Sequence, residues 1–103
     1  MRATWALVMV WVLAASPAAA QEAAAGRVLV KTYCAGCHAI ERTGSSPYPA
    51  APPFRTLNEK YDVEGLSEAL VEGLVSGHPD MPEYAFDPAE AAAIVAYLKS
   101  LEE

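Results

Sequence analysis

Apolar residues recur at helical spacing in several parts of the chain, and no stretch of useful length alternates between apolar and polar residues. The alanine-rich residues 23–32 predict a first helix. The last helix has the strongest start signal, because Asp87, Pro88 and Glu90 suit the N-cap, N1 and N3 positions of a capping-box variant. Its apolar side is formed by Ile94, Val95, Leu98 and Leu101, with Tyr97 beside them. The pattern predicts an all-α domain.

The middle of the chain carries weaker helical signals, which follow a loop. Residues 43–53 are rich in glycine, serine and proline, which excludes a helix or a central strand there. Residues 54–61 suit a short helix. After Asp62, a candidate N-cap, an apolar stripe predicts a further helix that we expect Gly77 to end. The stripe consists of Leu66, Leu70, Val71, Leu74 and Val75. In total we expect three to four short helices.

The first 20 residues have the pattern of a secretory signal peptide. A positive start at Arg2 precedes an apolar run over 5–15, and small residues up to Ala20 form a cleavage site. The run is shorter than the roughly 18 apolar residues that indicate a spanning helix, so we expect cleavage rather than retention as an anchor. Residues 1–20 are therefore predicted to be a signal peptide and residues 21–103 one domain, exported to the periplasm without a stable membrane span.

The predicted domain is acidic. The chain has 13 acidic and 7 basic residues, and only Arg2 among them lies in the predicted signal peptide, which leaves a net charge of −7. This balance argues against nucleic acid as a partner, since phosphates favour a basic surface. It permits steering toward a basic protein surface, and it equally suits an acidic surface that keeps a small protein in solution.

Residues 34–38 read Cys-Ala-Gly-Cys-His, a spacing typical of covalent haem attachment. Cys34 and Cys37 would add to the two vinyl groups of one porphyrin, and His38 would reach the iron from the same side. The alternatives are a redox-active dithiol and half of a zinc site. A dithiol site would be expected within a βαβ pattern, and zinc would need further ligands, whereas the only other histidine is the distant His78. We therefore expect one covalently bound haem c.

The second axial position of the iron decides between electron transfer and small-ligand chemistry. Met81 is the only methionine outside the predicted signal peptide. It stands in a loop between Pro79 and Pro82, whose fixed φ angles reduce the entropy lost on presenting a sulfur atom to iron. We predict that Met81 is the second ligand, with His78 as the competitor.

The chain as a whole resembles a bacterial class I c-type cytochrome. The resemblance consists of the signal peptide, the Cys-Ala-Gly-Cys-His motif after a helix, the proline-bearing loop, the Met81 loop and the C-terminal helix. The resemblance covers essentially all of residues 21–103. It implies a cytochrome c-like fold wrapped around one haem. It also implies a monomeric electron carrier between a donor and an acceptor protein, not an enzyme. A haem subunit of a periplasmic dehydrogenase or oxidase is the alternative, followed by a haem enzyme or gas sensor with an open sixth site.

The resemblance also assigns roles to individual residues. In that family the terminal helices cross at a contact between a small residue and an aromatic one, which would be Gly26 and Tyr97. A proline carbonyl accepts a hydrogen bond from Nδ1 of the proximal histidine, here His38, and fixes its ring. Pro52 is the better candidate for that carbonyl and Pro53 the other.

The chain departs from the family pattern in two respects. Both tryptophans, Trp5 and Trp11, fall in the predicted signal peptide, so no indole is available to a haem propionate. The candidates for that role are Tyr48, Arg55 and Tyr61. The chain also has only three lysines, Lys31, Lys60 and Lys99, so a basic ring for docking an acidic partner is not expected.

Overall fold

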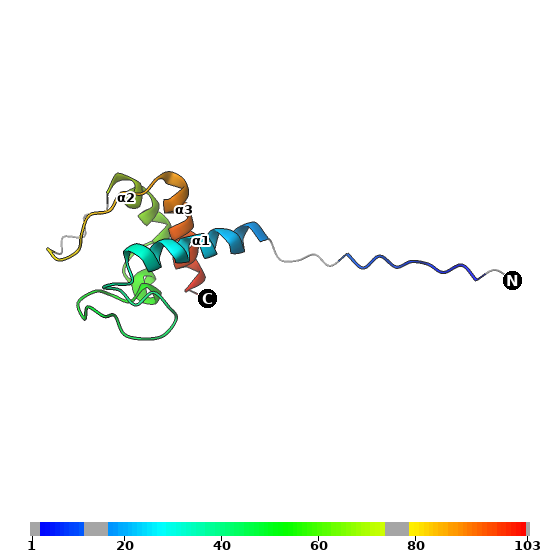
Figure 1. Ribbon diagram of the computed structural model, residues 1–103, viewed down its shortest axis with the longest axis horizontal. Helices are drawn as coiled ribbons and strands as arrows, with labels where there is room; N and C mark the ends of the chain where they lie inside the picture. Colours follow the sequence, from blue (N-terminus) through cyan, green and yellow to red (C-terminus); the bar gives the residue numbers. More distant parts are fainter. Residues whose placement is uncertain (1–2, 12–16, 74–78, 103) are drawn as a thin grey trace.

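The computed structural model describes residues 3–11, 17–73 and 79–102, and within these ranges it contains helices and connecting segments but no strand. The elements in chain order are α1 (Pro17–Tyr33), the 3-10 helices η1 (Phe54–Glu59) and η2 (Val63–Gly65), α2 (Leu66–Glu72) and α3 (Pro88–Ser100). Figure 1 shows the helices gathered in one body, from which the N-terminal residues extend. The predicted all-α fold is confirmed.

The core lies mainly between α1 and α3, the two helices that share the most extensive contact. Gly26 on α1 is buried against α3. A Cβ atom added at Gly26 would lie only 2.9 Å from the Cβ of Tyr97 and would overlap the backbone of Ala93. Only glycine allows the two helices to approach this closely. The contact expected between Gly26 and Tyr97 is therefore present.

Helix α1 begins at Pro17, earlier than the predicted 23–32. Alanine has the highest helix propensity, and the run of alanines upstream of Gln21 extends the helix. Residues 18–22 are exposed, so the helix crosses the predicted cleavage position after Ala20 without making core contacts there. Cleavage after Ala20 would remove no buried side chain from the described part of the domain.

The capping box of α3 is present as predicted. Asp87 Oδ1 accepts a hydrogen bond from the Glu90 backbone nitrogen at 2.8 Å, and Glu90 Oε1 accepts one from the Asp87 nitrogen at 3.2 Å. The predicted apolar residues of α3 are buried, and the Tyr97 hydroxyl donates to the Ile40 carbonyl at 2.6 Å. This bond fixes the chain that follows residues 34–38 against α3.

The helices of the middle segment are shorter than predicted. The short helix predicted over 54–61 is the 3-10 helix Phe54–Glu59, which ends two residues earlier, and Asp62 caps the 3-10 turn before α2. Helix α2 ends at Glu72, because Gly73 adopts a φ of 106°, a conformation that favours glycine. The predicted end at Gly77 is therefore wrong for α2, and Gly77 itself lies outside the described residues.

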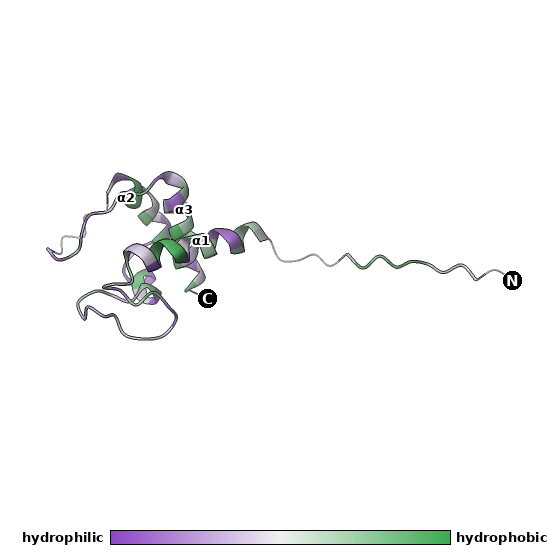
Figure 2. Cartoon of the chain, viewed as in Figure 1, coloured by the Kyte–Doolittle hydropathy of each residue, from purple (hydrophilic) through white to green (hydrophobic). Residues whose placement is uncertain are grey.

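Apolar residues of the helices and of the N-terminal segment differ in their surroundings, although both appear hydrophobic in Figure 2. The large side chains of residues 3–11, including Trp5 and Trp11, are exposed, whereas Val30 of α1 is fully buried. Among the residues that the structure describes, no helix is both long and apolar enough to cross a bilayer.

Candidate haem-binding site

The Cys-Ala-Gly-Cys-His motif continues the helical turn at the end of α1. The backbone nitrogens of Cys34 and Ala35 donate to the Val30 carbonyl at 2.8 and 2.9 Å. Those of Cys37 and His38 donate to the Cys34 carbonyl at 3.2 and 2.9 Å. Residues three and four positions apart on such a turn lie on one side of it. The backbone therefore brings the two thiols and the imidazole to one face, as covalent attachment requires.

The two cysteines lie in different environments, and neither forms a disulfide. Cys37 is exposed, whereas Cys34 packs against the core, and burial raises the pKa of its thiol to about 11. Zinc and dithiol chemistry both need a thiolate, which this environment disfavours. A thioether carries no charge, so burying it has no comparable cost. Within the described residues no group of three or more His, Cys, Asp or Glu side chains could hold a metal ion.

The half-buried His38 ring is held by the proline-rich loop. His38 Nδ1 lies 2.8 Å from the Pro52 carbonyl oxygen. Because a carbonyl can only accept, Nδ1 carries the hydrogen, and Nε2 keeps the lone pair with which imidazole binds metals. The ring also lies 4.7 Å from that of Phe54, at 34° between the two planes. Pro52, rather than Pro53, makes the contact that the resemblance implied.

Further hydrogen bonds join the loop over 43–53 and the residue after it to Cys37 of the motif and to Ala39, which directly follows the motif. The Tyr48 nitrogen donates to the Cys37 carbonyl at 3.1 Å. The Ala39 nitrogen donates to Ser46 Oγ at 3.0 Å, and the Ala39 carbonyl accepts from the Phe54 nitrogen at 2.9 Å. Nothing in the sequence pointed to Ser46, since a serine in a loop carries no distinctive pattern.

The half-buried Met81 belongs to a segment that is tied to this loop. Its neighbour Asp80 accepts a hydrogen bond from the Tyr48 hydroxyl at 2.6 Å. The structure thus links the residue next to Met81 to a residue that is bonded to the motif. His78, the predicted competitor of Met81, lies outside the described residues.

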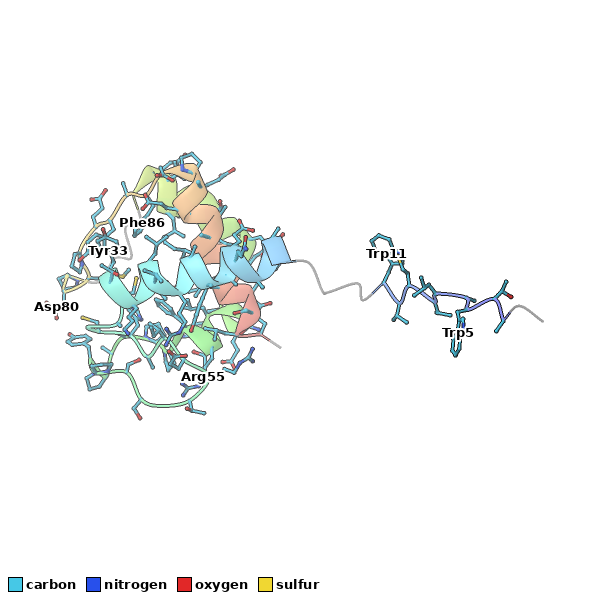
Figure 3. The ribbon with its side chains drawn as sticks, turned by 45° about the vertical axis from the view of Figure 1, so that its right-hand side comes forward. Trp5, Trp11, Tyr33, Arg55, Asp80 and Phe86 are labelled. Atoms are coloured by element: carbon cyan, nitrogen blue, oxygen red, sulfur yellow. The ribbon has the colours of Figure 1, made fainter. Side chains whose placement is uncertain are left out.

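Three aromatic rings connect the Met81 segment to the end of α1. The Tyr33 ring lies 5.6 Å from both the Tyr84 and Phe86 rings, and Tyr33 directly precedes Cys34. Figure 3 shows Tyr33, Phe86 and Asp80 in the same part of the molecule. The Phe86 nitrogen donates to the Leu70 carbonyl at 2.8 Å, which satisfies one of the carbonyls left free at the end of α2. No pattern in the sequence indicated this aromatic cluster.

The three residues predicted for a propionate contact have other surroundings in the structure. The Tyr48 hydroxyl donates to Asp80, and Arg55 Nη1 donates to the Gly44 carbonyl at 2.8 Å. Tyr61 is exposed. Figure 3 shows Arg55 well separated from Asp80. The propionate partner stays a prediction.

Comparison with known proteins agrees with this geometry. The family model described as Cytochrome c matches residues 23–102. Cytochrome c-552 of Bradyrhizobium diazoefficiens is 33% identical over 95 residues, which cover 92% of this chain and 89% of the relative. No solved structure matches the chain. The family match spans the motif, the Pro52 loop, the Met81 segment and α3, and the chain therefore belongs to the cytochrome c family as a class I c-type cytochrome with covalently attached haem c.

Proposed function

We propose that this haem electron carrier works in the periplasm with His38 and Met81 as the axial ligands of its iron. Cys34 and Cys37 form the thioether bonds that attach the porphyrin. When bound, the haem supplies a one-electron couple between Fe(II) and Fe(III), whose potential a thioether ligand raises.

The observation that carries this proposal is the hydrogen bond between His38 Nδ1 and the Pro52 carbonyl. The bond selects the tautomer whose Nε2 is free to bind a metal, and it fixes the orientation of the ring. Cys34 and Cys37 precede His38 on the same helical turn, so attachment through both sulfurs would leave the imidazole facing the macrocycle.

Met81 supports the role of a carrier over that of an enzyme. Its segment is held near the motif by the bond of Asp80 to Tyr48 on one side and by the packing of Tyr84 and Phe86 on Tyr33 on the other. A methionine held in this way would fill the second axial position and leave no site for a substrate on the iron. Pro79, two residues before Met81, and Pro82, directly after it, limit the conformational freedom of the loop.

The experiment that tests the ligand assignment compares the wild-type holoprotein with Met81→Ala. We expect the oxidised wild type to show the weak red-end absorption band of sulfur-ligated ferric haem, and its reduced form to bind carbon monoxide slowly and incompletely. Met81→Ala should lose the band and bind carbon monoxide rapidly. Rapid and complete binding by the wild type at neutral pH would overturn the assignment and favour the gas sensor or haem enzyme.

Export and domain boundaries are tested by the intact mass of the protein isolated from a periplasmic fraction. We expect the mass of residues 21–103 plus one haem, and a monomer in solution. Retention of residues 1–20 in a membrane fraction would contradict cleavage. Stable co-purification with a larger redox protein would contradict a freely diffusing carrier between a donor and an acceptor.

A further inference from the structure

The hydrogen bond between Tyr48 and Asp80 joins two segments that are 32 residues apart in sequence. Both segments lie outside the helices. Tyr48 lies between Pro47 and Pro49, and Asp80 follows Pro79. Each proline fixes a φ angle and restricts the residue before it. The bond therefore connects two stiff pieces of chain, so a displacement of one is passed to the other.

The Tyr48 end of this bond is anchored to the attachment motif. The Tyr48 nitrogen donates to the Cys37 carbonyl at 3.1 Å, and its carbonyl accepts from the Ala51 nitrogen at 3.0 Å. Ala51 directly precedes Pro52, whose carbonyl accepts from His38. The phenol thus extends from a short stretch of backbone, residues 48–52, in which Tyr48 is hydrogen-bonded to Cys37 and Pro52 to the proposed proximal histidine.

The Asp80 end is one peptide bond away from Met81. The carboxylate accepts the phenol hydrogen at 2.6 Å, and this hydrogen bond raises the pKa of Tyr48, so the phenol stays protonated and able to donate. A charged acceptor gives a stronger hydrogen bond than a neutral one.

We propose that Tyr48 is a positioning residue for Met81: through its hydrogen bond to Asp80 it holds the Met81 segment in register with the motif. The inference rests on the proposed ligation by His38 and Met81. Tyr48 does not touch the iron in this scheme. It stabilises the closed form of the Met81 segment relative to the form in which the sulfur has left.

The test uses the oxidised holoprotein and added imidazole, which competes with the Met81 sulfur for iron. Apparent affinity for a competitor scales with the fraction of molecules in which the segment is open. Removing one hydrogen bond to a charged, solvent-accessible acceptor should raise that fraction about five- to tenfold. Tyr48→Phe should therefore bind imidazole about five to ten times more tightly than the wild type.

Tyr84→Phe is the matched control, because it removes a hydroxyl in the Met81 segment itself. The structure shows no hydrogen bond for the Tyr84 hydroxyl among the described residues, and the ring that packs on Tyr33 is kept. We expect its imidazole affinity to equal that of the wild type. An equal increase in both variants would overturn the proposal, since any loosening of the segment would then suffice.

Asp80 variants show whether the effect passes through this pair. Asp80→Ala should raise imidazole affinity at least as much as Tyr48→Phe, and the double variant should show no further increase over Asp80→Ala. Asp80→Asn keeps an acceptor oxygen and should lie between Asp80→Ala and the wild type. Additive effects of Tyr48→Phe and Asp80→Ala would overturn the proposal.

The outcomes separate this inference from the proposed function. A wild-type spectrum without the red-end band would contradict Met81 ligation itself. A wild type with the band, together with unchanged imidazole affinity in Tyr48→Phe, would overturn only the role of Tyr48. If Tyr48→Phe fails to incorporate haem, Asp80→Ala carries the same test from the other side of the bond.

Discussion

Where α1 crosses α3, Gly26 and Tyr97 meet as buried residues of two regular helices, whereas the motif and Met81 are surrounded by irregular segments joined through hydrogen bonds and aromatic rings. Close packing of helices depends on complementary shape, so a single misplaced methyl group lowers stability. The irregular segments depend instead on a few specific contacts and on the haem that the family carries. The comparison shows that two regions of one chain are held together by different means, one by close packing of helices and the other by a few specific contacts around the haem-attachment motif.

The largest effect should come from preventing haem attachment with the double variant Cys34→Ala/Cys37→Ala. A domain of this size buries too little surface to be stable without a further covalent link, which the attached haem supplies. We expect it to lose most of its free energy of unfolding, on the order of 5 kcal/mol for a small domain, in a urea titration followed by circular dichroism. The helical signal that remains should come from α1 and α3. An unchanged unfolding curve would mean that the irregular segments around the motif and Met81 do not depend on haem for their stability.

The next effect comes from Gly26→Ala, which should break the helix crossing. The added methyl would meet the Ala93 backbone and the Tyr97 Cβ, so the helices must move apart, at a cost of about 1–3 kcal/mol of unfolding free energy. Gly65→Ala is the control, because nothing lies within 4 Å of its added Cβ. If both variants are equally stable in urea, the crossing is looser than its geometry indicates.

A smaller effect is expected from Tyr97→Phe, which keeps the crossing but removes the hydroxyl bonded to Ile40. Loss of this buried hydrogen bond should cost about 1 kcal/mol of unfolding free energy. Because Ile40 follows the motif by two residues, the variant also tests whether the two regions are independent. We expect the red-end absorption band of the oxidised protein to be unchanged; its loss would show that the crossing controls the Met81 side.

Features encoded by neighbouring residues were predictable from the sequence. The capping box depends on Asp87 and Glu90, and the attachment motif on five consecutive residues, so local chemistry decides both. The end of α2 was not predicted, because the apolar stripe continues past Gly73 while the positive φ of that glycine ends the helix. The stripe describes which side chains could be buried, but backbone conformation decided the boundary.

The long-range contacts of the irregular segments could not be read from the chain. Tyr48 and Asp80 are bonded across 32 positions, and neither belongs to a periodic element that would predict its orientation. Tyr33, Tyr84 and Phe86 meet only because α1 ends where the segment after Met81 returns. The contacts of Gly26 with Tyr97 and of His38 with Pro52 were anticipated through the family resemblance, not from pattern alone.

The bond from the Phe86 nitrogen to the Leu70 carbonyl fixes both ends of the stretch that contains Met81. The entropic cost of closing such a stretch grows only with the logarithm of its length, so changes within it need not disturb α2 or α3. The stretch that contains the proposed ligand Met81 is therefore a part of the chain whose length can change at a small entropic cost. With Met81 as the proposed ligand, substitutions or insertions between the two fixed ends offer a route by which evolution, or a protein engineer, can change the redox potential while the scaffold stays the same.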